Sequence, residues 1–101
     1  MKLDMEFRCM VGAYYGVKSM DDYDLKEYVL KDIENYIKNF IKANPIDGFN
    51  YQKEASLINE NVSLITKLQD SLIILSKIDA DLDLILMIKE KIKRLNKEKY
   101  A

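Results

Sequence analysis

Three aspartates at alternate positions, Asp79, Asp81 and Asp83, have the spacing with which a calcium-binding loop of the EF-hand type begins. In such a loop the sixth position is a glycine, which permits a sharp turn, and the twelfth is a glutamate that binds the ion. Counted from Asp79, Glu90 occupies the twelfth position, but the sixth is Leu84. A bulky apolar residue opposes that turn, and acids are common where a helix begins because the helix dipole favours negative charge there. We therefore interpret these acids as helix caps and expect no metal site.

Residues for the common catalytic sites are missing. The chain has no histidine, which excludes Ser-His-Asp and Cys-His pairs, the Glu-x-x-His motif of di-iron bundles and imidazole ligands for zinc. Its one cysteine, Cys9, excludes a thiolate metal site and an intrachain disulfide. Cys9 lies in an apolar pattern with no cluster of cations around it, which favours a core residue over a reactive thiol. The sequence therefore predicts no catalytic residues and no cofactor.

The segment KEKIKRLNKEKYA at the C-terminal end is basic. A row of cations on a helix is one footprint of a nucleic-acid-binding protein. Here Glu90 and Glu98 interrupt the row, and a helix that ends in cations also matches its own dipole. Nucleic acid is therefore the alternative partner, and its candidate residues are Lys89, Lys91, Lys93, Arg94, Lys97 and Lys99.

Aromatic residues outside the apolar stripes are the better candidates for binding. Tyr23 and Tyr28 lie off the apolar face of a helix, and the loop NPIDGFNY carries Ile46, Phe49 and Tyr51. Tyrosine is enriched in interface hot spots because it buries a large area and still finds a hydrogen bond. These five residues are the predicted protein-binding site. The competing interpretation is that the rings fold inward and close the end of the bundle.

Apolar residues at helical spacing run from Ser19 to Asn44: Leu25, Val29, Ile33, Tyr36, Ile37 and Phe40. We expect a helix over 20–43, with Ser19 as its N-cap. It ends at Asn44-Pro45, because the residue before a proline is pushed out of the α region.

From Gln52 onward there is no glycine and no proline, but the apolar stripe changes direction. The residues from Leu57 to Leu75 cluster on one side of a continuous helix, and those from Ile78 to Leu95 on another, displaced by roughly 150°. A turn near Lys77–Asp81 lets both stripes face one core. We therefore predict helices over 53–76 and 80–98 that form an antiparallel hairpin, with Asp79 or Asp81 capping the second. The alternative is one uninterrupted helix shared between two subunits.

The first 18 residues fit two periods. Leu3, Met5, Phe7, Cys9 and Val11 occupy alternate positions, as in a half-buried strand. Helical spacing is satisfied equally by Leu3, Phe7, Met10, Val11 and Tyr14. A lone strand would need a partner, and the chain offers no second convincing strand. A helix over 3–15 with Gly16 as its C-cap is favoured, and a strand that pairs across a dimer is the alternative.

Together these elements predict an all-α, four-helix bundle-like fold in a single helical domain, 1–101. The 49% apolar and 33% charged residues suit a globular protein, and the net charge of -1 demands no polyanionic partner. No apolar run approaches the ~20 residues that span a bilayer, and the N-terminus lacks the apolar core of a signal peptide. We expect a cytoplasmic protein that does not bind membranes.

The last two predicted helices carry more apolar residues than one bundle seam requires, including the run from Leu84 to Ile88. This excess predicts a homodimer with two-fold packing. For function we expect a small non-catalytic protein that binds another protein. Its class would be a regulator, inhibitor or immunity-type factor of a low-GC bacterium or its phage.

Overall fold

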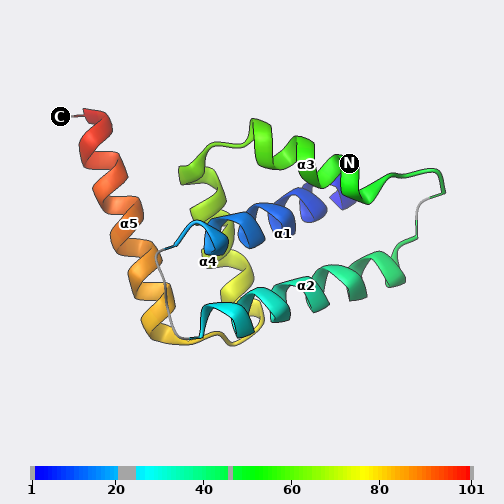
Figure 1. The fold of residues 1–101 in the computed structure, drawn as a ribbon, viewed down its shortest axis with the longest axis horizontal. Helices are drawn as coiled ribbons and strands as arrows, with labels where there is room; N and C mark the ends of the chain where they lie inside the picture. The colour runs from blue at the N-terminus through cyan, green and yellow to red at the C-terminus, as the bar shows by residue number, and fades with distance from the viewer. Residues whose placement is uncertain (1, 21–24, 46, 101) are drawn as a thin grey trace.

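The computed structural model describes residues 2–20, 25–45 and 47–100, which form five α-helices and no strand (Figure 1). The helices are α1 (Lys2–Lys18), α2 (Lys26–Ala43), α3 (Tyr51–Asn61), α4 (Leu64–Lys77) and α5 (Leu82–Tyr100). The all-α class and the N-terminal helix are confirmed, and the strand alternative for the first residues is wrong. None of these helices is long and apolar enough to cross a bilayer.

Helix α1 is the centre of the molecule. It packs against α2, α3 and α4, whereas α5 packs mainly against α4 (Figure 1). The α1–α4 contact is the most extensive of these. Consequently α2 and α3 lie on either side of α1, and α5 forms one end of the molecule.

Two glycines let α4 approach α1 closely. A Cβ atom on Gly12 would collide with the Asp70 carboxylate, and one on Gly16 would lie 2.5 Å from the Lys67 carbonyl oxygen. Gly16 is therefore not the predicted C-cap. Helix α1 continues past it to Lys18, and the glycine instead provides room for the backbone of α4.

Polar groups buried in this contact have partners. The Ser71 hydroxyl, which is fully buried, is placed to donate to the carbonyl oxygens of Lys67 (2.9 Å) and Ala13 (3.1 Å). The Arg8 guanidinium donates to both oxygens of the buried Asp70 carboxylate, at 2.9 and 3.1 Å. A carboxylate that is paired and hydrogen-bonded can be buried at a tolerable free-energy cost. Because this ion pair is bidentate and joins the two helices, it also fixes the register of α1 on α4.

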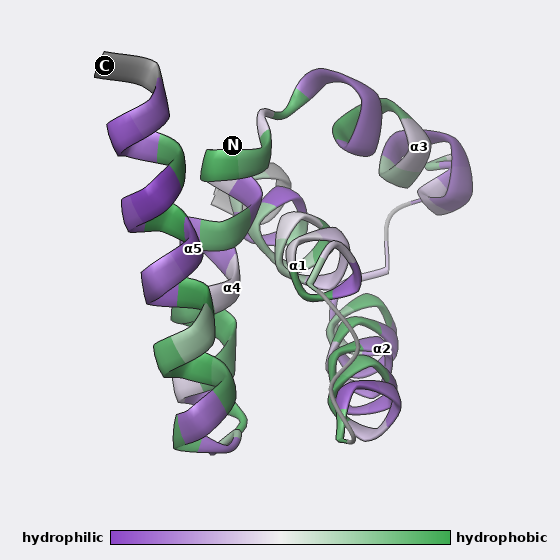
Figure 2. Ribbon diagram, turned by 60° about the vertical axis from the view of Figure 1, so that its left-hand side comes forward, coloured by the Kyte–Doolittle hydropathy of each residue, from purple (hydrophilic) through white to green (hydrophobic). Residues whose placement is uncertain are grey.

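The apolar core lies around this contact and extends to α2 and the first half of α5. Figure 2 shows α5 hydrophobic in its N-terminal half and hydrophilic in its C-terminal half. The buried core residues are Met10, Ala13, Val17, Met20, Val29, Leu30, Ile33, Leu68, Ile74, Leu75, Leu84 and Ile88. The half-buried side chains of Leu72, Ile85 and Ile92 pack against them, as the two apolar stripes predict.

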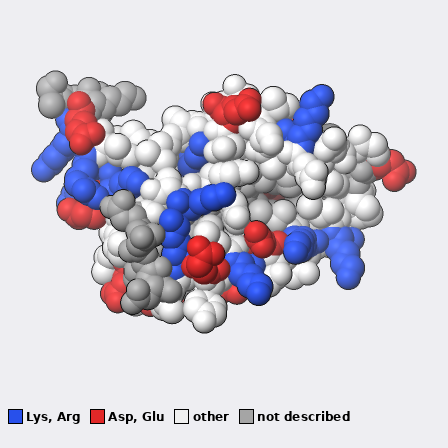
Figure 3. Space-filling view, in the orientation of Figure 1, with Lys and Arg blue, Asp and Glu red and all other residues white. Residues whose placement is uncertain are grey.

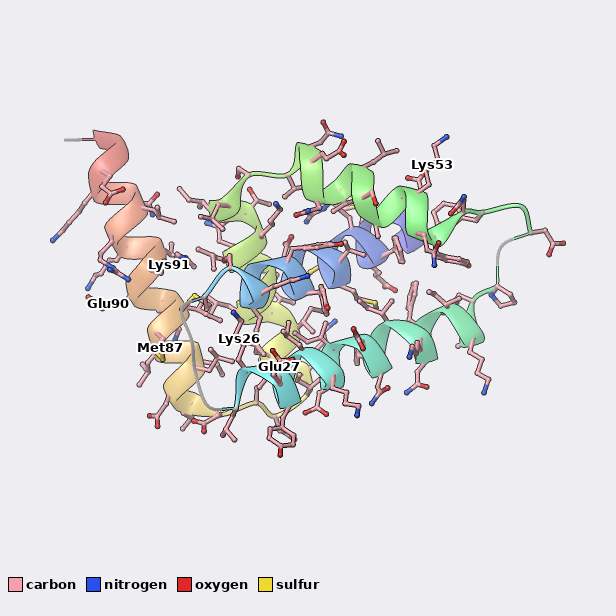
Figure 4. All side chains as sticks on the ribbon, viewed as in Figure 1. Lys26, Glu27, Lys53, Met87, Glu90 and Lys91 are labelled. Atoms are coloured by element: carbon pink, nitrogen blue, oxygen red, sulfur yellow. The ribbon has the colours of Figure 1, made fainter. Side chains whose placement is uncertain are left out.

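The end of α1 differs from the prediction. Ser19 does not cap α2, because its hydroxyl donates to the Gly16 carbonyl oxygen at 2.6 Å and α2 begins only at Lys26. The carbonyl oxygens that follow α1 are satisfied by lysines instead. Lys26 Nζ donates to that of Met20 (2.8 Å), and Lys91 Nζ from α5 donates to that of Ser19 (3.0 Å; Figure 4).

The single helix predicted over 53–76 is wrong, because the chain breaks between α3 and α4. Val62 is extended, and Ser63 caps α4 by accepting a hydrogen bond from the Thr66 amide at 3.2 Å. The Asn61 side chain also closes the end of α3 by donating to the Leu57 carbonyl oxygen (2.8 Å). The break lets α3 pack on α1 while α4 runs in a different direction.

The turn predicted near Lys77–Asp81 is confirmed. Helix α4 ends at Lys77, and Asp79 takes a left-handed conformation with φ 51°, while the Ala80 amide donates back to the Leu75 carbonyl oxygen (3.1 Å). This is the hydrogen bond of a Schellman cap. Asp81 then accepts from the Asp83 amide at 2.8 Å, so it is the acid that caps α5.

Replacing Gly16 with alanine tests the close approach of α1 and α4. In an ordinary helix interior this change stabilises by about 0.5–1 kcal/mol. Here the added methyl group meets the Lys67 backbone, so we expect a loss of about 1–3 kcal/mol, measured by urea denaturation. A variant more stable than the wild type would contradict the close contact.

Candidate protein-binding face

A groove runs over α1 between α2 and α3. Its volume is about 380 Å³ and most of its walls are apolar or aromatic. The lining residues come from these three helices: Phe7, Val11, Tyr14, Tyr15, Glu34, Ile37, Lys38, Ile41, Tyr51, Gln52 and Ala55. An adjoining hollow shares Tyr14 and Glu34 with the groove and adds Tyr28 from α2. We call the surface that carries Tyr14, Tyr15, Tyr28 and Tyr51 the tyrosine face.

Helix α1 supplies two neighbouring rings to this face. The rings of Tyr14 and Tyr15 meet edge to face with centroids 5.3 Å apart, and Lys18 Nζ lies 5.9 and 6.0 Å from them. The Tyr14 hydroxyl donates to Glu34 of α2 at 3.3 Å. Burial raises the pKa of Tyr14, and the Glu34 carboxylate raises it further, which favours the protonated phenol that donates this hydrogen bond. These contacts hold both rings in place at the floor of the groove.

The two rings predicted in the loop are packed inward, and the structure places Tyr51 at the start of α3. Phe49 and Tyr51 are half-buried, and both meet the buried Phe7 ring edge to face, with centroids 5.9 and 5.6 Å away. The Phe49 and Tyr51 rings also contact each other, with their centroids 4.7 Å apart. The packing supports the interpretation that they close the end of the bundle. A contribution of Phe49 and Tyr51 to partner binding stays a prediction.

One polar atom at this end has no partner. The Tyr51 hydroxyl is buried, and no other described residue forms a hydrogen bond with it. Buried hydroxyl groups are normally paired with protein or water, because an unpaired one costs free energy. The Tyr51 ring lines the groove, but its hydroxyl is enclosed by the protein and stays unpaired there.

Of the other residues predicted to bind a partner, the structure describes only Tyr28. Tyr28 is 70% exposed and lies on α2, toward the end opposite the loop of Phe49, yet on the tyrosine face. Tyr23 and Ile46 lie outside the described residues. The structure thus brings Tyr28 and Tyr51 to one surface together with Tyr14 and Tyr15. Tyr14 and Tyr15 are not among the residues that the sequence predicts for binding.

The basic residues of α5 do not form one patch. Lys89, Lys93 and Lys97 are exposed and follow helical spacing along one face, whereas the exposed Arg94 lies about 100° from the middle of that row. Lys91 is half-buried and bonded to the end of α1. The Lys99 side chain lies outside the described residues. Figure 3 shows that acidic side chains interrupt the basic ones over α5.

A second hollow, of about 790 Å³, lies between α1, α2 and α4 and contains Cys9 and the Arg8–Asp70 pair. Burial raises the pKa of the Cys9 thiol, and the Asp70 carboxylate raises it further. A raised thiol pKa disfavours the nucleophilic thiolate. Within the described residues, no group of three or more acidic, cysteine or histidine side chains could hold a metal ion.

Comparison with known proteins adds no identity, since no protein family, curated protein or solved structure matches this chain.

Substituting Phe49 with alanine distinguishes a ring that closes the bundle from an exposed anchor. Because Phe49 contacts Phe7 and Tyr51, we expect unfolding to become easier by about 2–4 kcal/mol in urea denaturation. The exposed Tyr28 is the matched control, and its replacement with alanine should change stability by no more than about 0.5 kcal/mol. Equal stability of the two variants would show that the loop packing is incorrect.

Proposed function

We propose that this protein is a non-catalytic binding protein and that another protein docks on its tyrosine face. Its role would be that of a regulator, inhibitor or immunity-type factor in the cytoplasm of a low-GC bacterium or of a phage-infected cell. The observation that carries the proposal is the gathering of Tyr14, Tyr15, Tyr28 and Tyr51 along an open, mostly apolar groove.

Tyrosine on a rigid support is well suited to recognition. The ring buries a large area with little loss of side-chain entropy, and the hydroxyl provides a hydrogen bond. Here the floor rings are already fixed by their mutual contact and by Glu34, so binding need not order them. A partner that offers apolar side chains would therefore fit this surface.

Nucleic acid is the second candidate partner, because Lys89, Lys93 and Lys97 form an exposed row on α5. Phosphate contacts by such a row would make binding fall steeply with salt. The interrupting acids and the position of Lys91 against α1 leave few cations for a continuous backbone contact. We therefore rank protein above nucleic acid.

The test is a comparison of captured proteins. Immobilised wild-type protein and a Tyr15→Ala, Tyr28→Ala double variant are exposed to the same bacterial lysate, and bound proteins are identified by mass spectrometry. A true partner should be retained at raised salt by the wild type. Its affinity for the double variant should be at least about tenfold weaker, which corresponds to ~1.4 kcal/mol.

A variant with Lys89, Lys93 and Lys97 changed to alanine is the control, and it should keep the partner. A partner that binds the wild type and the Tyr15→Ala, Tyr28→Ala double variant equally well would overturn the proposal. Retention of nucleic acid, lost between low and moderate salt and abolished in the lysine variant, would establish the second candidate instead.

A further inference from the structure

Helix α2 presents a row of alternating charge along the edge of the tyrosine face. Glu27, Lys31, Glu34 and Lys38 are all exposed, and their spacing of four, three and four residues keeps them within about 60° of one helix face. Glu34 and Lys38 line the groove, while Glu27 and Lys31 line the adjoining hollow beside Tyr28. Figure 3 shows red and blue side chains alternating along this helix.

Among the described residues, these four side chains form no salt bridge. Glutamate followed by lysine four residues later often forms a pair inside one helix. Among the described residues, however, the one salt bridge is between Arg8 and Asp70, on other helices. Glu34 accepts a hydrogen bond from Tyr14, which is uncharged. The row is therefore free to pair with charges on another molecule.

The order of the four charges makes the row complementary to itself. If a second α2 lies antiparallel about a two-fold axis between Asp32 and Ile33, Glu27 faces Lys38 of the second copy. Lys31 then faces Glu34 of the second copy, and the symmetry repeats both pairs. A parallel arrangement would instead bring like charges together. We infer that a second copy of this chain docks on the tyrosine face, with its α2 antiparallel to the first.

The exposed area is sufficient for such a contact. The chain exposes 6916 Å², whereas a compact monomer of 11.8 kDa would expose about 5,900 Å². The excess of about 1,000 Å² compares with about 800 Å² that each protein buries in a standard interface. Tyr28, which is 70% exposed, flanks the charged row. The inference rests on the proposed function, since it names one occupant of the same face.

Charge reversal and sedimentation of the full chain test this dimer. At high micromolar concentration the wild type should sediment at twice its 11.8 kDa mass. Glu27→Lys with Glu34→Lys makes the row entirely basic, and Lys31→Glu with Lys38→Glu makes it entirely acidic. Each double variant alone should be at least tenfold weaker in self-association, and an equimolar mixture of the two should dimerise.

Two further variants control for folding and net charge. Reversing all four charges restores the complementary order but removes the Tyr14–Glu34 hydrogen bond. This variant should therefore self-associate at least tenfold more strongly than either double variant, with a helical circular dichroism spectrum. Glu90→Lys with Glu98→Lys places the same added charge on exposed positions of α5 and should leave the dimer intact.

A monomeric wild type would overturn the inference, as would double variants that self-associate like the wild type or a mixture that stays monomeric. These outcomes leave the proposed function separately testable, because capture of a different protein by the tyrosines does not require self-association. The proposed function would fail on a different result, namely equal capture of the partner by the wild type and by the Tyr15→Ala, Tyr28→Ala double variant.

Discussion

The close approach of α1 to α4 is the constraint on which the rest of this fold depends. Gly12 and Gly16 remove the side chains that would hold the two helices apart, and Ser71 and Asp70 fill the contact with satisfied polar groups. Since close-packed interiors tolerate little added volume, even one methyl group at this crossing must be accommodated by backbone movement. The contact thereby sets the position of α1 for every helix that packs on it.

The tyrosine face follows from this arrangement. With α4 covering one side of α1, the helices α2 and α3 can each reach only a flank, and the groove remains between them. The Phe7 ring ties the start of α3 to α1 through Tyr51, and Tyr14 ties α2 to α1 through Glu34. The same contacts that position the helices therefore also present the rings and the charged row of α2.

Hydrophobic periodicity was sufficient for the all-α class, the helix that ends at Asn44 and the hairpin between α4 and α5. It was insufficient at residues 61–63, because the apolar stripe continues through a break that is made by local capping. Ser63 was the available signal, since serine favours N-caps. At Ser19 the same preference misled, because the hydroxyl caps the end of the preceding helix. The groove itself depends on how three helices meet, which spacing within one helix does not encode.

Native-state hydrogen exchange of the full chain tests the central role of the α1–α4 contact most directly. We expect the slowest amides in α1 and α4, near Val17 and Leu75, to exchange only through global unfolding. Amides of α3, which has no buried residue, should exchange through local opening at lower free energy. Slowest exchange in α2 or α5, with α1 opening locally, would contradict the account.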